Sequence, residues 1–395
     1  MSIEKSSSST NNTTSNHQYP FIMAVADRPD AVFVKGKGDW IFDQHGKKYL
    51  DFVQGWAVNC LGHCPDILVD ILCSQARTLW NSSPAFYNQP MLDLAGSLAT
   101  ACEMDQVFFS SSGAEANEGA IKLARKWAQI NKPNATQIIT THGSFHGRTL
   151  ATMSASGKPA FEPLFNPKLP GFKKVPFDDI DAMTAALDED VIAVMLEPIQ
   201  GEAGVVTPSE GYLQQLERLC RQKHVLLILD EIQTGMGRTG QLVAAKTFGL
   251  NPDIITLGKG LGGGAPMSAL LAKNDVCCFQ PGDQGGTFSG TPLLSAVSLA
   301  VLNTINRVDF LKQVRCSSRY LADGLVTTFG TDLVRGKGLL LAVDRPAGDA
   351  VLMVEKAREK GLLINAPNDY CLRFMPALNV KEDSIDKLIS ILNDL

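Results

Sequence analysis

The sequence lacks the features that define several large classes of protein. No apolar run approaches the ~18 residues that a membrane-spanning helix needs, so no membrane association is expected. Lysine and arginine total 36 against 41 aspartates and glutamates, and they form no basic stripe, which argues against nucleic acid as a partner. The net charge of −5 and the 45% apolar content are ordinary for a soluble globular protein.

The nine cysteines and six histidines lack the spacings of metal sites. No C-x-x-C pair and no H-E-x-x-H motif is present, and we therefore expect no metal. An odd number of cysteines without a signal peptide favours reduced thiols and a cytoplasmic location. Residues 1–18 are rich in Ser, Thr and Asn but have no apolar core and no arginine, so they are predicted to form a disordered tail rather than a targeting peptide.

Apolar runs that end in polar residues dominate the middle of the chain. The segments 191–196, 225–229 and 254–257 are mostly apolar, which is typical of strands buried on both faces of a parallel sheet. They alternate with helical patterns, such as the one over 209–223, and this alternation predicts an α/β fold. From 31 to 52 apolar and polar residues alternate instead, which predicts a hairpin or short meander. At 395 residues the chain is too long for one small core.

Two chemically active side chains follow neighbouring predicted strands. Asp230 ends one strand and Lys259 follows the next, 29 positions later (259 − 230). In open α/β sheets, ligands bind at the carboxyl ends of strands, so both groups are expected on one rim. A strand-end Asp is also common as a turn residue or helix cap, and a Lys there is often only solvated. The glycines on both sides of Lys259 indicate close approach of backbone or ligand.

These residues lie in a recognisable pair of motifs. The runs DEIQTGMGRTG (230–240) and DIITLGKGLGGG (253–264) resemble the class-III pyridoxal-phosphate aminotransferases, which act on ω-amino groups, and especially the acetylornithine aminotransferases. Lys259 matches the lysine that links covalently to the cofactor in that family. Asp230 matches the aspartate that pairs with the pyridine nitrogen, and Gln233 matches the glutamine beside the phenolic oxygen of the ring.

The resemblance extends to residues that hold the phosphate. Residues 107–127 read as strand, glycine turn and helix, and a helix N-terminus is an anion site. There Ser112, Gly113 and Ala114 match the phosphate cup of the family. Thr287 matches a threonine that reaches the phosphate of the neighbouring subunit's cofactor, which implies a homodimer with shared active sites. The surrounding loop departs from the family at four positions: Gln284, Gly286, Ser289 and Thr291.

Three further matches concern the ring and the substrate. Phe145 and Arg148 belong to the family's F-H-G-R motif, in which the aromatic stacks on the cofactor and the arginine takes a substrate carboxylate. A core Phe and a surface Arg would be the alternative. Arg373, in LRFMPAL, matches an arginine that grips an α-carboxylate, and Glu202 matches the glutamate that pairs with it when no second carboxylate is bound. Arg373 could also form an internal ion pair, since leaving it buried and unpaired costs several kcal/mol.

The resemblance implies the fold known as type I, with a large domain around a mostly parallel seven-stranded sheet. A smaller α+β domain comes from both ends of the chain. We predict the divisions 1–18 (tail), 19–60 (small domain), 61–298 (large domain) and 299–395 (small domain).

The implied activity is transfer of the δ-amino group of N-acetylornithine to 2-oxoglutarate, a step of arginine biosynthesis. Alternatives are an aminotransferase for ornithine, succinylornithine or succinyldiaminopimelate, a related mutase, or a non-catalytic protein on this scaffold. In ornithine aminotransferases a tyrosine matches Gly55, so Gly55 favours an acylated substrate. Trp56 would pack on the acyl group or lie in the core.

Overall fold

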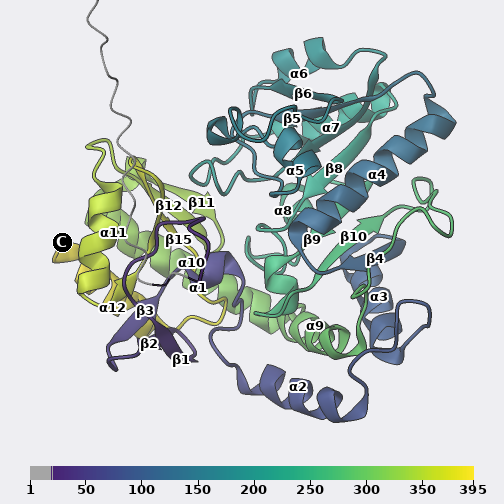
Figure 1. Ribbon diagram of the computed structural model, residues 1–395. Helices are drawn as coiled ribbons and strands as arrows, with labels where there is room; N and C mark the ends of the chain where they lie inside the picture. Colours follow the sequence, from purple (N-terminus) through teal and green to yellow (C-terminus); the bar gives the residue numbers. More distant parts are fainter. Residues whose placement is uncertain (1–18, 20) are drawn as a thin grey trace, which may run out of the picture.

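A computed structural model describes residues 19 and 21–395, so the predicted tail over 1–18 lies outside the described residues. The described residues form one seven-stranded sheet with helices around it, and two four-stranded sheets beside it (Figure 1). Within the described residues, no helix combines the length and apolar character needed to span a bilayer.

The seven-stranded sheet has the order β4-β10-β9-β8-β7-β5-β6. Strands β5 to β9 pair in parallel, whereas β10 is antiparallel to both β9 and β4, which confirms a mostly parallel sheet. β7 and β8 are buried along their whole length, which explains their continuous apolar runs. The strands are β4 Gln106–Ser110, β5 Gln137–Thr141, β6 Phe172–Val175, β7 Val191–Leu196, β8 Leu226–Asp230, β9 Ile254–Leu257 and β10 Ser268–Ala272.

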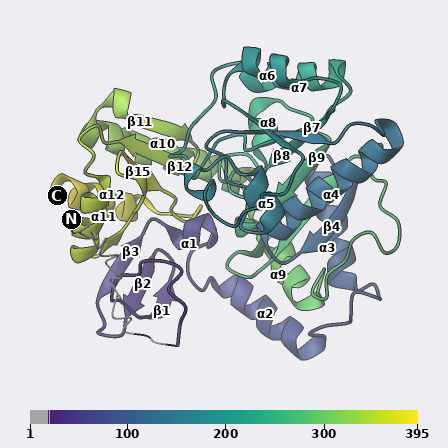
Figure 2. The same cartoon turned by 45° about the horizontal axis from the view of Figure 1, so that its top comes forward.

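Helices cover this sheet. The long helix α4 (Gly113–Asn131) packs on β10, β9, β4, β7 and β8, and α9 (Pro292–Ile305) packs against α2 (Asp66–Thr78) and α3 (Gln89–Cys102). Figure 2 shows α4 crossing β8 and β9. The remaining helices here are α5 Leu150–Ala155, α6 Ile180–Ala186, α7 Tyr212–Gln222 and α8 Ala244–Phe248, with the 3-10 turns η1 Pro159–Phe161 and η2 Lys259–Gly262.

The two smaller sheets join segments from distant parts of the sequence. β1 (Phe33–Lys37), β2 (Trp40–Asp43) and β3 (Lys48–Asp51) form the predicted meander, and β13 (Leu362–Leu363) adds to β3 in parallel. The other sheet has the order β11-β12-β15-β14. In Figure 1 the purple N-terminal strands lie against the yellow-green C-terminal elements. These elements are α10 Val308–Phe329, η3 Thr331–Leu333, β11 Val334–Lys337, β12 Leu340–Asp344, α11 Ala350–Glu359, β14 Asn365–Asn368, β15 Cys371–Phe374 and α12 Glu382–Asn393.

One apolar surface is left uncovered by the chain itself. In α2 only Leu68 is buried, and the apolar side chains along the rest of the helix are exposed. Exposed apolar residues continue through the segment that follows α2 and recur in the loop before α9. Together they are Ile67, Val69, Ile71, Leu72, Leu79, Trp80, Phe86, Tyr87, Leu92 and Phe288. An apolar surface of this extent is typical of an interaction site.

Candidate active site

A cavity of about 270 Å³ opens at the carboxyl ends of β7, β8 and β9. Most of the residues singled out from the sequence lie in its wall, which is where open α/β sheets bind their ligands. The wall consists of Gly113, Ala114, Asn117, Phe145, His146, Gly147, Arg148, Glu197, Glu202, Asp230, Ile232, Gln233 and Lys259.

Asp230 and Lys259 meet at this rim as the sequence predicts. Their strands are adjacent and parallel, with Asp230 opposite Thr256, and Lys259 begins the turn η2 directly after β9. Burial lowers the pKa of Lys259; Glu202 and other carboxylates oppose this shift, and Arg373 adds to it. A lowered pKa favours the neutral amine, which is the form that can act as a nucleophile or a base.

The Asp230 carboxylate is held by partners for which no role was predicted. Oδ2 lies 2.7 Å from Nδ1 of His146 and accepts a hydrogen bond of 2.7 Å from Nδ2 of Asn117. Oδ1 accepts one from the backbone N–H of Ile232. Asn117 is held in turn by Thr256, whose hydroxyl donates to its Oδ1. Helix α4 and strand β9 therefore fix the orientation of Asp230. His146 lies inside the F-H-G-R motif, and Asn117 follows the predicted phosphate cup in the run SGAEAN (112–117), so both adjoin residues singled out from the sequence.

Glu197, at the end of β7, joins two loops of the site. One carboxylate oxygen accepts a hydrogen bond from the backbone N–H of Phe145 at 2.9 Å, and the other accepts one from Gly201 at 3.2 Å. Burial, and then the charge of Asp230, raises the pKa of Glu197 to about 7. Glu197 thus connects the loop that carries Phe145 with the loop that carries Glu202.

Arg373 is 1% exposed and lies behind Glu202. Its Nη1 is 2.9 Å from Oε1 of Glu202 and donates to the Gly201 carbonyl, while Nε and Nη2 both donate to Oδ1 of Asn365. Burial by itself would raise the pKa of Glu202, but Arg373 and Lys259 outweigh it and hold that pKa below its usual range. The pair predicted from the resemblance is therefore formed, with Glu202 ionised between Arg373 and the cavity.

Phe145 and Arg148 differ in exposure. Phe145 lines the cavity and packs on Phe161, with 5.9 Å between ring centroids. Arg148 is exposed, and its guanidinium lies 5.4 Å from the Phe161 ring centroid and 6.0 Å from that of Phe145. A guanidinium over aromatic rings is attracted to their faces, so Arg148 stands at the cavity edge in a defined position.

The predicted phosphate cup is the first turn of α4. Ser112 is the N-cap and forms a capping box with Glu115, while Gly113 and Ala114 line the cavity. A Cβ on Gly113 would lie 2.7 Å from Ile232, so the helix start packs directly against the residues that follow Asp230. The N-terminal N–H groups and the helix dipole make this turn suitable for an anion.

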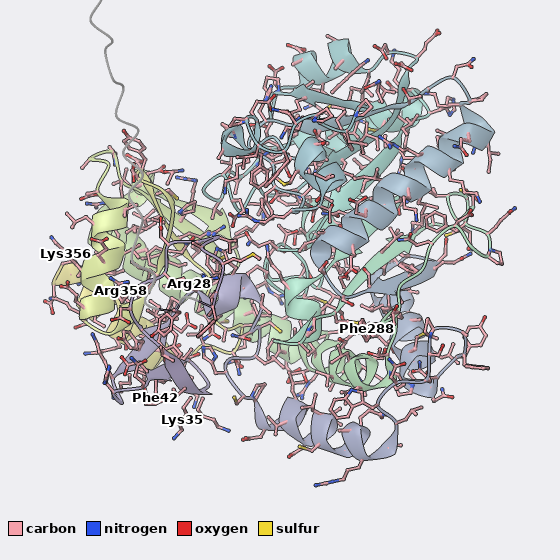
Figure 3. All side chains as sticks on the ribbon, viewed as in Figure 1. Arg28, Lys35, Phe42, Phe288, Lys356 and Arg358 are labelled. Carbon is pink, nitrogen blue, oxygen red and sulfur yellow. The ribbon has the colours of Figure 1, made fainter. Side chains whose placement is uncertain are left out.

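Thr287, Trp56 and Gly55 are exposed and do not line the cavity of this chain. Thr287 lies on an exposed loop before α9 and is not among the cavity-lining residues; the adjacent Phe288 is 64% exposed (Figure 3). The base of that loop is held on α4 by the pairs Lys126–Asp283 and Lys122–Gln284. Trp56 is 52% exposed, so the interpretation that it lies in the core is wrong. Gly55 is also exposed.

The residues present fit pyridoxal phosphate. Gln233 Nε2 is buried and has no hydrogen-bond partner among the described residues, so it is available to a group bound in the cavity. The remaining groups are an amine of lowered pKa, a carboxylate fixed by hydrogen bonds, an aromatic ring and a helix N-terminus. These match the aldehyde, ring nitrogen, ring face and phosphate of that cofactor.

Comparisons with known proteins agree with this chemistry. The family model for class-III aminotransferases matches residues 22–395. Acetylornithine aminotransferase 2 of Bordetella bronchiseptica is 50% identical over 378 residues, covering 94% of this chain and 96% of that protein. Acetylornithine aminotransferase of Ralstonia nicotianae is 50% identical over 384 residues, covering 95% and 96%.

Solved structures of the same kind superpose over most of the chain. Ornithine aminotransferase from Toxoplasma gondii gives a TM-score of 0.91 at 34% identity, covering 95% of this chain and 92% of that one. N-acetylornithine aminotransferase from Stenotrophomonas maltophilia gives 0.81 at 36% identity, covering 93% and 95%. The seven-stranded sheet and the two smaller sheets thus belong to one shared architecture.

Proposed function

Because the chain belongs to the class-III aminotransferases, we propose that it moves the δ-amino group of N-acetylornithine to 2-oxoglutarate. The products are N-acetylglutamate 5-semialdehyde and glutamate, and the reaction serves arginine biosynthesis. The observation that carries the proposal is the pair formed by Glu202 and Arg373 at the cavity wall.

The pair addresses a problem that two unlike substrates create. Glutamate presents two carboxylates, whereas N-acetylornithine presents its reacting amine far from its single carboxylate. A permanently free Arg373 beside Arg148 would always favour the dicarboxylate. With Glu202 on Arg373, only Arg148 remains to bind a carboxylate, which suits N-acetylornithine. Once Glu202 moves away, Arg373 is free for the second carboxylate of glutamate.

The residues of the chain supply positioning and proton transfer. Lys259 Nζ, in its neutral form, would take the proton from the amine-bearing carbon of the substrate and deliver it to the cofactor carbon that receives the amino group. Asp230, fixed by Asn117 and beside His146, supplies negative charge for a protonated ring nitrogen. The first turn of α4 binds the phosphate, and Phe145 covers one ring face. Bound pyridoxal phosphate supplies the electron-withdrawing ring that stabilises negative charge on the substrate carbon.

We also propose that the protein acts as a homodimer. The exposed apolar surface of α2 and the segment after it supports this, since such a surface is stabilised when a second copy covers it. A dimer would also let the exposed Thr287 loop reach a neighbouring cavity. A cytoplasmic location would keep the nine free cysteines reduced.

A panel of amino donors with 2-oxoglutarate as acceptor tests the proposal. Free ornithine carries a charged α-ammonium that needs an acceptor once it is desolvated. No tyrosine stands at Gly55 to help hold that end. We expect kcat/KM for N-acetylornithine to exceed that for ornithine by at least ~10²-fold, the scale of one unpaired charged group. Comparable kcat/KM values for the two donors would contradict the N-acetylornithine assignment and leave a general ω-aminotransferase. Ornithine aminotransferase, the name of the Toxoplasma gondii structure, would then be one candidate.

A further inference from the structure

The Glu202 carboxylate lies between two cations. Its Oε1 is 2.9 Å from Nη1 of Arg373, and its Oε2 is 3.6 Å from Nζ of Lys158. The contact with Glu202 is the one ion pair that Lys158 forms within the described part of the chain. Each oxygen of one carboxylate therefore faces a different positive charge, although only the Arg373 contact is at hydrogen-bond distance.

The backbone that carries Glu202 is anchored on both sides. Gln200 exchanges two backbone hydrogen bonds of 3.0 Å with Val206, and its side-chain amide donates to Thr141 and to the carbonyl of His142. Gly201 donates to Glu197. With this loop held, the displacement of Glu202 that releases Arg373 is a rotation of its side chain.

Lys158 lies next to Glu202 and Phe145 of the cavity wall. The preceding Gly157 pairs with His142 and donates to the backbone carbonyl of Ser144, and a Cβ there would lie 2.1 Å from the Thr141 carbonyl. The side chain of Lys158 extends toward two aromatic rings. Its amine lies 5.9 Å from the ring centroid of Phe145 and 6.0 Å from that of Phe161. The position of the amine is thus defined by a close-packed turn and an aromatic pair.

Rotation of Glu202 away from Arg373 creates an energetic problem. Its pKa is held below the usual range, so the group that rotates is an ionised carboxylate, and its side chain is only 19% exposed. A partly buried charge that loses its partner is costly. At 3.6 Å, the Lys158 amine is within ion-pair range of Glu202 but beyond hydrogen-bond distance, and its attraction strengthens as the carboxylate rotates toward it.

We propose that Lys158 is the alternate partner of Glu202 and holds its carboxylate while Arg373 binds a substrate carboxylate. Lys158 is then a specificity-determining residue that acts through Glu202. It favours the dicarboxylate half of the reaction by lowering the free energy of the displaced position. The inference rests on the proposed function, because it needs one substrate that displaces Glu202 and another that does not.

Binding of two unreactive five-carbon acids to the holoenzyme tests this role. Glutarate has two carboxylates and must displace Glu202, whereas pentanoate has one and need not. In Lys158→Gln we expect the dissociation constant of glutarate to rise about 3- to 5-fold and that of pentanoate to change less than about 1.5-fold. Lys158→Arg should restore glutarate binding. Lys223→Gln, which removes the same charge at the opposite end of the sheet, should change neither.

Two further measurements distinguish a role of Lys158 through Glu202 from direct binding of a substrate carboxylate by Lys158. In single-turnover experiments, Lys158→Gln should raise the glutamate concentration needed for half-maximal rate while leaving N-acetylornithine nearly unchanged. In a Glu202→Gln background, Lys158→Gln should no longer distinguish glutarate from pentanoate.

Equal loss of both acids in Lys158→Gln would overturn the proposal and make Lys158 a direct carboxylate receptor. No change in either acid would also overturn it. Neither acid is a donor, so these binding results stand even if the donor panel rejects N-acetylornithine.

Discussion

The two ends of the central sheet differ in how they hold charge. At the carboxyl ends of β7 to β9 the cavity is about 270 Å³, and its carboxylates Asp230 and Glu197 are buried with defined donors. At the amino ends, a larger groove of about 840 Å³ is lined by residues 131–135, 187–190, 223 and 224. Its acidic residues are exposed, and Asp188 pairs with Lys173 on the surface.

The volume of a groove or cavity therefore does not identify a reactive site. Chemistry depends on removing charged groups from water and fixing them with partners, because that is what shifts pKa values and orients atoms. The smaller cavity, at the carboxyl ends of the strands, meets both conditions.

Among variants at the carboxyl end of the sheet, the largest effect is expected for Lys259→Ala. We expect turnover to fall by at least ~10³-fold, because both the covalent link to the cofactor and the proton-transferring amine are lost. Folding should be nearly unaffected, because the side chain lines the cavity and is not part of the apolar core. The measurement is single-turnover activity together with borohydride reduction, which makes the link permanent in the natural protein. A link that persists in the variant would mean that another lysine performs this role.

Thr287 lies on an exposed loop away from both ends of the sheet, and it tests whether the cavity is complete in one chain. We expect Thr287→Val to weaken pyridoxal-phosphate binding by about 1–3 kcal/mol, the cost of removing one hydrogen bond to a partly buried charged group. The dissociation constant can be followed by fluorescence at several protein concentrations. Full activity retained on dilution to monomers would show that the cavity does not need a second chain.

Glu197 tests whether burial at the carboxyl end has a thermodynamic cost. Its pKa is raised from 4.5 to about 7, so between these values the folded protein binds more protons at this residue than the unfolded chain does. The contribution of Glu197 to stability is therefore lost as pH rises through that window.

Glu197→Gln cannot titrate, and we expect its stability to fall less than that of the natural protein between pH 5 and pH 8, by about 1–3 kcal/mol. Urea unfolding of both proteins at the two pH values measures the difference. Glu231 is also buried, and its pKa is also raised to about 7. It is present in both proteins, so its contribution to the pH dependence cancels when they are compared. Parallel pH dependence would show that Glu197 stays ionised in the fold.

The smallest effect is expected at the amino end. Lys223 is exposed and lines the larger groove. Lys223→Gln should change the free energy of unfolding by no more than about 0.5 kcal/mol and leave kcat and KM unchanged. Steady-state kinetics and urea unfolding check this directly, and a loss of activity would mean that the groove takes part in function.

Much of the sheet and one pair of site residues could be predicted from local pattern. Continuous apolar runs mark β7, β8 and β9, and the order of β8 and β9 is enough to bring Asp230 and Lys259 to one rim. The pair of Glu202 with Arg373 joins residues 171 positions apart (373 − 202), so it was accessible only through the resemblance.

Other contacts of the site depend on loop geometry that no periodicity encodes. His146 reaches Asp230 from the loop after β5, and Lys158 approaches Glu202 from the turn before η1. The exposure of Trp56 has the same origin, since it lies in the irregular turn α1 (Gln54–Ala57) at a φ of +62°. These outcomes were fixed by tertiary packing around short irregular segments.

The pairing of β3 with β13 also determines the order in which parts of the protein can form during synthesis. Leu50 pairs with Leu362, 312 positions later (362 − 50), and Arg373 lies on β15 beyond it. At roughly 5–20 residues per second, a ribosome adds those residues in about 15–60 s. During that interval the seven strands of the large sheet are complete, while the N-terminal meander still lacks its fourth strand. The nascent chain therefore contains Asp230, Lys259 and the first turn of α4 well before it contains Arg373, the partner of Glu202.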